Sequence, residues 1–229
     1  MKKKSFLIFV IVILISIFGV VITLGITSLS PFEKFFNSIK ESKNDDDKLV
    51  KVNGEVIYYK EFKIKKSFNQ LTYDIYKSQP DFDKLSQQQK SDIEKQYVDL
   101  ISKSNETIIR ELIESKVLIQ EAQKLGLSVD RHHAYEQHKS NYETIKQAGD
   151  DNYKFIASYI EENDITEEEY LELAGDAYCD LISKTNLENH YYNNDNLKAE
   201  FKSFDIYVEY LIDIADIEYY DVYKEIIKQ

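Results

Sequence analysis

The stretch NETIIRELIESKVLIQEAQKLGL, residues 105–127, indicates the fold class of this chain. Asn105 is a suitable N-cap, and Gly126 stands where a left-handed residue commonly closes a helix. Between them, apolar residues recur at helical spacing and form a broad face: Ile108, Ile109, Leu112, Ile113, Val117, Leu118 and Ala122. So wide an apolar face predicts a helix at the centre of a core.

Further helical patterns lie on both sides of this central helix. Upstream, apolar residues among lysines predict a helix over 60–77, and a second helix over 85–102 follows the break at Pro80. Downstream, Asp130 can cap a helix that runs to about Ala148. The 229 residues include only 6 Gly and 2 Pro, which favours long helices over a turn-rich fold.

The second half of the chain continues the helical pattern. A short helix is expected through Phe155, Ile156 and Tyr159. Thr166 and Glu169 then form a capping-box pattern at the start of another helix. A last helix is expected to carry five apolar residues: Leu197, Phe201, Phe204, Tyr207 and Leu211.

Strand-like patterns stand at the two ends of this helical body. Apolar and polar residues alternate over residues 49–59 on both sides of Asn53-Gly54, a pair that suits a two-residue turn. The tail DIEYYDVY, residues 216–223, alternates in the same way. We therefore expect a mainly α fold with a small β element formed by its N- and C-terminal strands, which would hold the two ends side by side.

An apolar run precedes the folded region. No charged residue occurs from Ser5 to Phe32, and about 20 apolar residues suffice to cross a bilayer. A cleaved signal peptide is the alternative, but its apolar core usually has about 7–15 residues. Three lysines, at positions 2–4, place the N-terminus in the cytoplasm. The expected organisation of this single-pass cell-membrane protein is therefore a cytoplasmic tip and transmembrane anchor over 1–27, a polar spacer over 28–48 and an extracytoplasmic helical domain over 49–229.

Charge is distributed unevenly along the outward part. Residues 28–149 hold 20 Lys+Arg and 20 Asp+Glu, whereas residues 150–229 hold 6 and 21, a local net charge of −15. Such a surface is usually a solvated face that keeps a domain soluble; alternatively, it attracts basic clients. This charge distribution disfavours nucleic acid as a partner, because phosphate binding needs a basic stripe and the sequence shows none.

Several residues that could carry chemistry have structural explanations. Cys179 is the only cysteine and lies in a helical apolar pattern, which predicts a small buried side chain. His132, His133 and His138 lack the i,i+4 spacing that lets two histidines of one helix share a metal ion. The acidic run 167–169 suits the first turn of a helix, and Asp45-Asp46-Asp47 lacks the Gly and Glu of a calcium loop. We expect no catalytic residue, no cofactor and no metal site.

Three segments, in order, resemble the N-terminal chaperone domain of SurA- and PrsA-type extracytoplasmic foldases. They are Val52-Asn53-Gly54-Glu55, the helix from Leu112-Ile113 to Gly126-Leu127, and the segment Thr166–Tyr170. The resemblance covers about residues 49–222, and ADIEYYD near the end is similar to the strand that closes such domains. It implies a helical domain that binds unfolded or partly folded polypeptide.

The chain departs from many members of that family in one respect. It has no Gly-rich, His-containing segment of the kind that forms a parvulin prolyl isomerase domain. Isomerase activity is therefore not implied, and no peptide-binding residue can be carried over. The expected function is that of a membrane-anchored chaperone-like protein for exported polypeptides. The alternative is a scaffolding module of the cell envelope that binds one folded partner; a second copy of the chain, in a homodimer, is a further candidate partner.

Overall fold

A small antiparallel sheet joins the two ends of the described chain. The computed structural model describes residues 46–77, 86–91, 95, 101–149, 151–162 and 166–228. Strands β1 (Lys48–Val52) and β2 (Glu55–Tyr58) form a hairpin, and β3 (Ile217–Tyr219) pairs with the other edge of β1, giving the order β2-β1-β3. The predicted pairing of the strands at the two ends is therefore confirmed.

The hairpin turn follows directly from its two residues. Asn53 and Gly54 both have positive φ values, 47° and 88°, as a tight hairpin turn of this kind requires. The same turn contributes to the pairing with β3, because the Asn53 N–H donates to the Asp216 carbonyl at 2.8 Å and the Asn53 side chain accepts from the Asp216 N–H at 2.8 Å. One Asn thus shapes the hairpin and ties it to the end of the chain.

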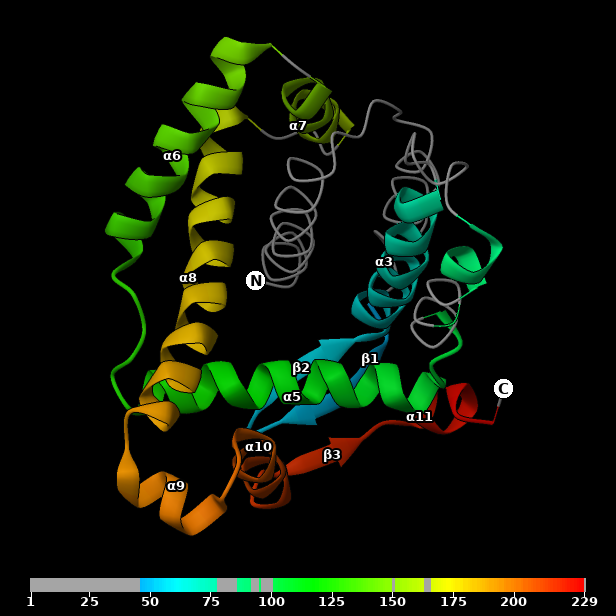
Figure 1. The fold of residues 1–229 in the computed structure, drawn as a ribbon, viewed down its shortest axis with the longest axis vertical. Coiled ribbons are helices and arrows are strands. Elements are labelled where there is room, and N and C mark those ends of the chain that lie inside the picture. Colours follow the sequence, from blue (N-terminus) through cyan, green and yellow to red (C-terminus); the bar gives the residue numbers. More distant parts are fainter. Residues whose placement is uncertain are drawn as a thin grey trace.

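Helices make up most of the described chain, as predicted. They are α3 (Tyr59–Lys77), α5 (Asn105–Lys124), α6 (Arg131–Ala148), α7 (Asp151–Glu162), α8 (Glu167–Tyr192), α9 (Asp195–Phe201), α10 (Phe204–Asp213) and α11 (Asp221–Ile226). Figure 1 shows α5 lying along the sheet, with α3 rising near one end of α5 and the α6–α8 pair rising from the other. α9 and α10 lie on the opposite side of α5 from these arms (Figure 1).

α5 is the centre of the core, and its seven predicted apolar residues are all buried. Its start lies one residue earlier than expected: Ser104, and not Asn105, is the N-cap, because its side chain accepts the Thr107 N–H. Its end is as predicted, with Gly126 at a φ of 68°. The Leu127 and Gly126 N–H groups bond back to the carbonyls of Ala122 and Gln123, which is a Schellman motif.

The α6–α8 pair forms a long arm that depends on one close approach. Asp130 caps α6, and Gly149 ends it at a φ of 60°, both as predicted. The capping box of Thr166 and Glu169 opens α8, also as predicted. Where the two helices cross, a Cβ on Gly175 would lie 3.1 Å from the Tyr135 Cα. Gly175 therefore lets the two backbones approach one another.

Two predictions near the C-terminus were wrong. The expected last helix is two helices, α9 and α10, because Lys202 adopts a φ of 60° and the Ser203 side chain caps a new helix by accepting the Ile206 N–H. The expected terminal strand ends at Tyr219. The following residues form α11, where Ile226 is buried in the same core as β1 and α5.

Some expectations fall wholly or partly on residues that the structure does not describe. Of the helix expected over 85–102, residues 87–91 are helical and much of the remainder lies outside the described residues. The anchor over 1–27 and the spacer up to residue 45 lie outside them as well. None of the helices in the described ranges is long and apolar enough to span a bilayer.

Candidate interaction surface

Exposed apolar side chains gather near the C-terminal end of the described chain. Among the residues that the structure describes, the large apolar ones that remain exposed are Leu125, Tyr192, Ile206, Tyr210, Ile214, Tyr219 and Ile227. Apart from Leu125, all of them lie between residues 192 and 227. Single exposed apolar residues are common on protein surfaces, so their arrangement decides whether they form a site.

Three of these residues form one row along α10. Ile206, Tyr210 and the C-cap residue Ile214 are four residues apart, so they follow one another on the same side of the helix and its end. Their exposed fractions are 49%, 44% and 58%. We call Ile206, Tyr210 and Ile214 the α10 stripe; it spans about 12 Å at a rise of 1.5 Å per residue.

A row of carboxylates runs beside the α10 stripe. Asp205, Glu209 and Asp213 each precede a stripe residue by one position, which sets the two rows about 100° apart around the helix. All three carry exposed side chains. We call them the acidic row.

The acidic row keeps most of its negative charge. Glu209 pairs with Arg110 of α5. Within the described part of the chain, neither Asp205 nor Asp213 forms an ion pair. Burial raises the pKa of Glu114, and the nearby carboxylates of Glu111, Glu209 and Asp205 add to this shift against the opposing charge of Arg110. Among the described residues, the three carboxylates of the acidic row therefore face one cation, Arg110, which acts on Glu209 and Asp213, so the row carries a net negative charge.

The third face of α10 fixes the helix in the core. Tyr207, Val208 and Leu211 are buried there. The Tyr207 ring stacks on Tyr191 of α8 at 5.9 Å and lies 5.0 Å from the Phe201 ring. Its hydroxyl donates to Glu121 of α5 at 3.3 Å, and burial together with this carboxylate raises the pKa of Tyr207 to about 12. The exposed rows are thus presented by a helix with a fixed orientation.

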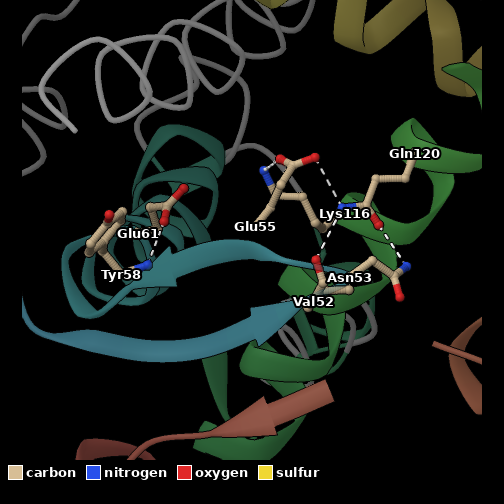
Figure 2. A network of polar contacts seen from close by, with 7 residues as sticks. All are labelled: Val52, Asn53, Glu55, Tyr58, Glu61, Lys116 and Gln120. Atoms are coloured by element: carbon tan, nitrogen blue, oxygen red, sulfur yellow. Dashed lines mark hydrogen bonds and ion pairs between the residues drawn. The ribbon is translucent and has the colours of Figure 1, made fainter. Parts of the chain in front are cut away.

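A separate polar network, shown in Figure 2, joins the hairpin turn to α5. The Gln120 side-chain amide donates to the Val52 carbonyl and to Glu55, both at 3.1 Å, and accepts from Asn53 at 2.9 Å. Lys116 pairs with Glu55 at 3.1 Å. These contacts hold the turn against α5.

Glu61 lies at the other end of the same hairpin. Its buried carboxylate accepts the Tyr58 N–H at 2.6 Å, at the junction of β2 and α3 (Figure 2). Burial raises the pKa of Glu61 to about 7, against the opposing effect of the Tyr58 hydrogen bond and the cations of Lys116 and Lys60. Its hydrogen bond closes the first turn of α3, which is a structural role.

The three histidines of α6 have different environments. His132 and His133 are exposed, as their interpretation as surface residues implies. His138 is half-buried against the Tyr170 ring of α8 at 5.8 Å, which the sequence reasoning missed. Burial lowers the pKa of His138 to about 4, and its Nε2 is buried without a hydrogen-bond partner. The described residues contain no group of His, Cys, Asp or Glu able to hold a metal ion.

The remaining residues that could suggest chemistry have structural contacts. Cys179 is half-buried, and its thiol points to the Val129 carbonyl at 3.8 Å. In the acidic run of α8, Glu169 completes the capping box and Glu167 pairs with Lys146 at 2.8 Å. Asp45 lies outside the described residues, whereas Asp46 pairs with the buried Lys60 at 2.6 Å.

Sequence reasoning also missed the α10 stripe. The segment FDIYVEYLIDI, residues 204–214, is apolar on more than one side of a helix, which was the available signal. Burying Tyr207, Val208 and Leu211 accounts for one side only.

In comparisons with known proteins, no family model, no curated protein and no solved structure matches this chain. Its function is therefore inferred from its own residues.

Proposed function

We propose that this chain is a membrane-anchored, extracytoplasmic chaperone-like protein that binds unfolded or partly folded exported polypeptides. The observation that carries the proposal is the α10 stripe, an apolar row left exposed on a helix whose other apolar side is buried. Unfolded polypeptides expose apolar side chains that a native protein buries. An apolar row can therefore contact the apolar segments of many different clients.

The sequence supplies the proposed location. The uncharged run from Ser5 to Phe32 is long enough for an anchor, and the three preceding lysines favour a cytoplasmic N-terminus. The domain would then work just outside the membrane, where exported chains emerge unfolded.

The described arrangement also supports the resemblance to the N-terminal chaperone domain of SurA- and PrsA-type foldases. Such a domain is expected to begin with a strand at Val52-Asn53-Gly54-Glu55, to centre on one long helix and to close with a strand. β1, which ends at Val52 before the turn at Asn53-Gly54, is followed by α5 and then by β3, which pairs with β1 and precedes α11. No catalytic activity is part of this proposal.

Aggregation of denatured clients tests the proposed function. The full chain is placed in phosphatidylcholine nanodiscs and added in stoichiometric amount to reduced lysozyme and, separately, to heat-unfolded citrate synthase. We expect reduced light scattering from both clients, because both expose apolar segments. Empty nanodiscs provide the background.

Absence of suppression for both clients, from a chain whose far-UV circular dichroism shows it to be folded, would contradict the proposal. The scaffold with one folded partner would then be the better account. Capture of a single native protein from solubilised membranes would be the evidence for it.

A further inference from the structure

The α10 stripe and the acidic row lie side by side on one helix, and their combination restricts what can dock there. An apolar row alone would accept any apolar segment. The adjacent carboxylates favour a segment that carries cations beside its apolar residues, and they disfavour one that carries anions. They also disfavour an anionic lipid surface, which attracts basic segments instead.

The spacing of the stripe fits a helical partner. Ile206, Tyr210 and Ile214 present an apolar side chain about every 6 Å along about 12 Å. A second helix with apolar residues at i, i+4 and i+8 repeats at the same interval, so its side chains can pack between those of α10. A basic residue next to each of its apolar residues would face the acidic row.

We propose that the α10 stripe and the acidic row form a docking site for the apolar face of a basic amphipathic helix in a client polypeptide. This inference rests on the proposed function, because it names the class of polypeptide segment that the chaperone-like protein binds. Asp205 and Asp213 select the positive charge, and Ile206, Tyr210 and Ile214 supply the apolar contact.

Two synthetic peptides of about 18 residues, or five helical turns, test this proposal. Both carry the same row of Leu residues; one has Lys and the other Glu at the remaining positions. Each is labelled with fluorescein, and its anisotropy is measured against the full chain in phosphatidylcholine nanodiscs, with empty nanodiscs as background. We expect the Lys peptide to bind at least about tenfold more tightly at low salt, and the difference to shrink above about 0.1 M salt.

Variants on the surface assign the binding to α10. Ile206→Ser combined with Ile214→Ser should weaken binding of the Lys peptide by about tenfold or more, because it removes two of the three apolar contacts. Ile227→Ser, at another exposed apolar residue, is the matched control and should leave binding unchanged. Asp205→Asn combined with Asp213→Asn should weaken the Lys peptide and not the Glu peptide. All of these residues are exposed, so the variants should retain the wild-type circular dichroism.

Equal binding of the two peptides, or full binding of the Lys peptide to the Ile206→Ser/Ile214→Ser variant, would overturn the proposal. Suppression of client aggregation separates this failure from that of the proposed function. If suppression persists while the peptides do not distinguish charge, only the docking site is wrong. If suppression is also absent, both are wrong.

Discussion

At the scale of single residues, Glu61 makes stability depend on pH. Its folded pKa of about 7 lies above its ordinary value of 4.5, so the folded chain holds this proton more tightly. The contribution of the protonated Glu61 side chain to stability is fully present below pH 4.5 and is lost as pH rises through 7. Glu61→Gln stays neutral and can still accept the Tyr58 N–H. We therefore compare the free energies of unfolding of Glu61→Gln and the wild type. Their difference should grow by about 2 kcal/mol in favour of the variant from pH 5 to pH 8.

Urea unfolding of the full chain in nanodiscs, followed by circular dichroism at both pH values, measures this difference. Glu188→Gln, at an exposed position of α8, is the matched control and should follow the wild type. Parallel pH profiles for Glu61→Gln and the wild type would show that Glu61 does not titrate in this range.

His138 should act in the opposite direction. Its folded pKa of about 4 lies below its ordinary value of 6.5, so the unfolded chain binds the proton more tightly. The contribution of the neutral His138 imidazole to stability is fully present above pH 6.5 and is lost as pH falls toward 4. Phe does not titrate and can keep the contact with Tyr170. The free energy of unfolding of His138→Phe, relative to that of the wild type, should therefore be about 2 kcal/mol higher at pH 5 than at pH 8. The same denaturation series tests this, and an equal difference at the two pH values would refute it.

Individual residues were predictable where the signal is local. The caps at Asp130, Thr166 and Gly126 depend on a few neighbouring residues, and the sequence shows them. The burial of His138 depends on Tyr170, which is 32 positions away in sequence, and local pattern contains no trace of it.

At the scale of elements, the contact between α6 and α8 depends on Gly175. A side chain there meets the Tyr135 backbone at 3.1 Å, and a helix backbone cannot move aside on its own. We expect Gly175→Val to lower the free energy of unfolding by about 2 kcal/mol through overpacking. Glu172→Val, at an exposed position of the same helix, controls for the helix propensity of Val and should cost less than about 1 kcal/mol. If urea unfolding showed equal losses of free energy of unfolding for the two variants, the close approach of α6 and α8 at Gly175 would not contribute to stability.

Most helices were predictable because their apolar residues keep the helical period over several turns. The division between α9 and α10 was not, since the apolar pattern continues across it and the break depends on Lys202 at a positive φ. α11 was mistaken for a strand because DVYKEI is too short for its period to be decisive. The α10 stripe was missed for a related reason: a pattern identifies apolar residues but not which of them the tertiary structure covers.

At the scale of the whole molecule, one core holds both ends of the described chain. Ile226, near the C-terminus, is buried with Leu49 and Val50 of β1, and the Ile226 carbonyl accepts from Asn105 at 2.9 Å. Ile226→Ala should therefore lower the global free energy of unfolding by about 2–4 kcal/mol, as for other core truncations. Its neighbour Ile227 is 43% exposed, and Ile227→Ala should cost less than about 1 kcal/mol.

Urea unfolding of the two variants compares them directly. A small loss for Ile226→Ala would show that the C-terminal helix unfolds separately from the rest.

The pairing of the two ends was predictable because alternating patterns stood at both ends of a helical chain. The packing of α3, α5 and α8 around the two ends was not predictable. Helical periodicity identifies the apolar face of each helix but not the element that packs against it.

The location of the domain is testable in spheroplasts. In a Cys179→Ser background, Ser128→Cys places a thiol at an exposed position between α5 and α6. We expect a membrane-impermeant maleimide to label it without permeabilisation, because the positive N-terminus should stay inside. Labelling only after permeabilisation would place the domain in the cytoplasm.

We propose that unfolded polypeptide binds at the α10 stripe. Light scattering of aggregating reduced lysozyme tests this binding most directly, with the full chain in nanodiscs as wild type, as Ile206→Ser/Ile214→Ser and as Ile227→Ser. We predict suppression by the wild type and by Ile227→Ser, and loss of most of it in the double variant, because only that variant removes the apolar row. Undiminished suppression by a folded double variant would contradict the claim.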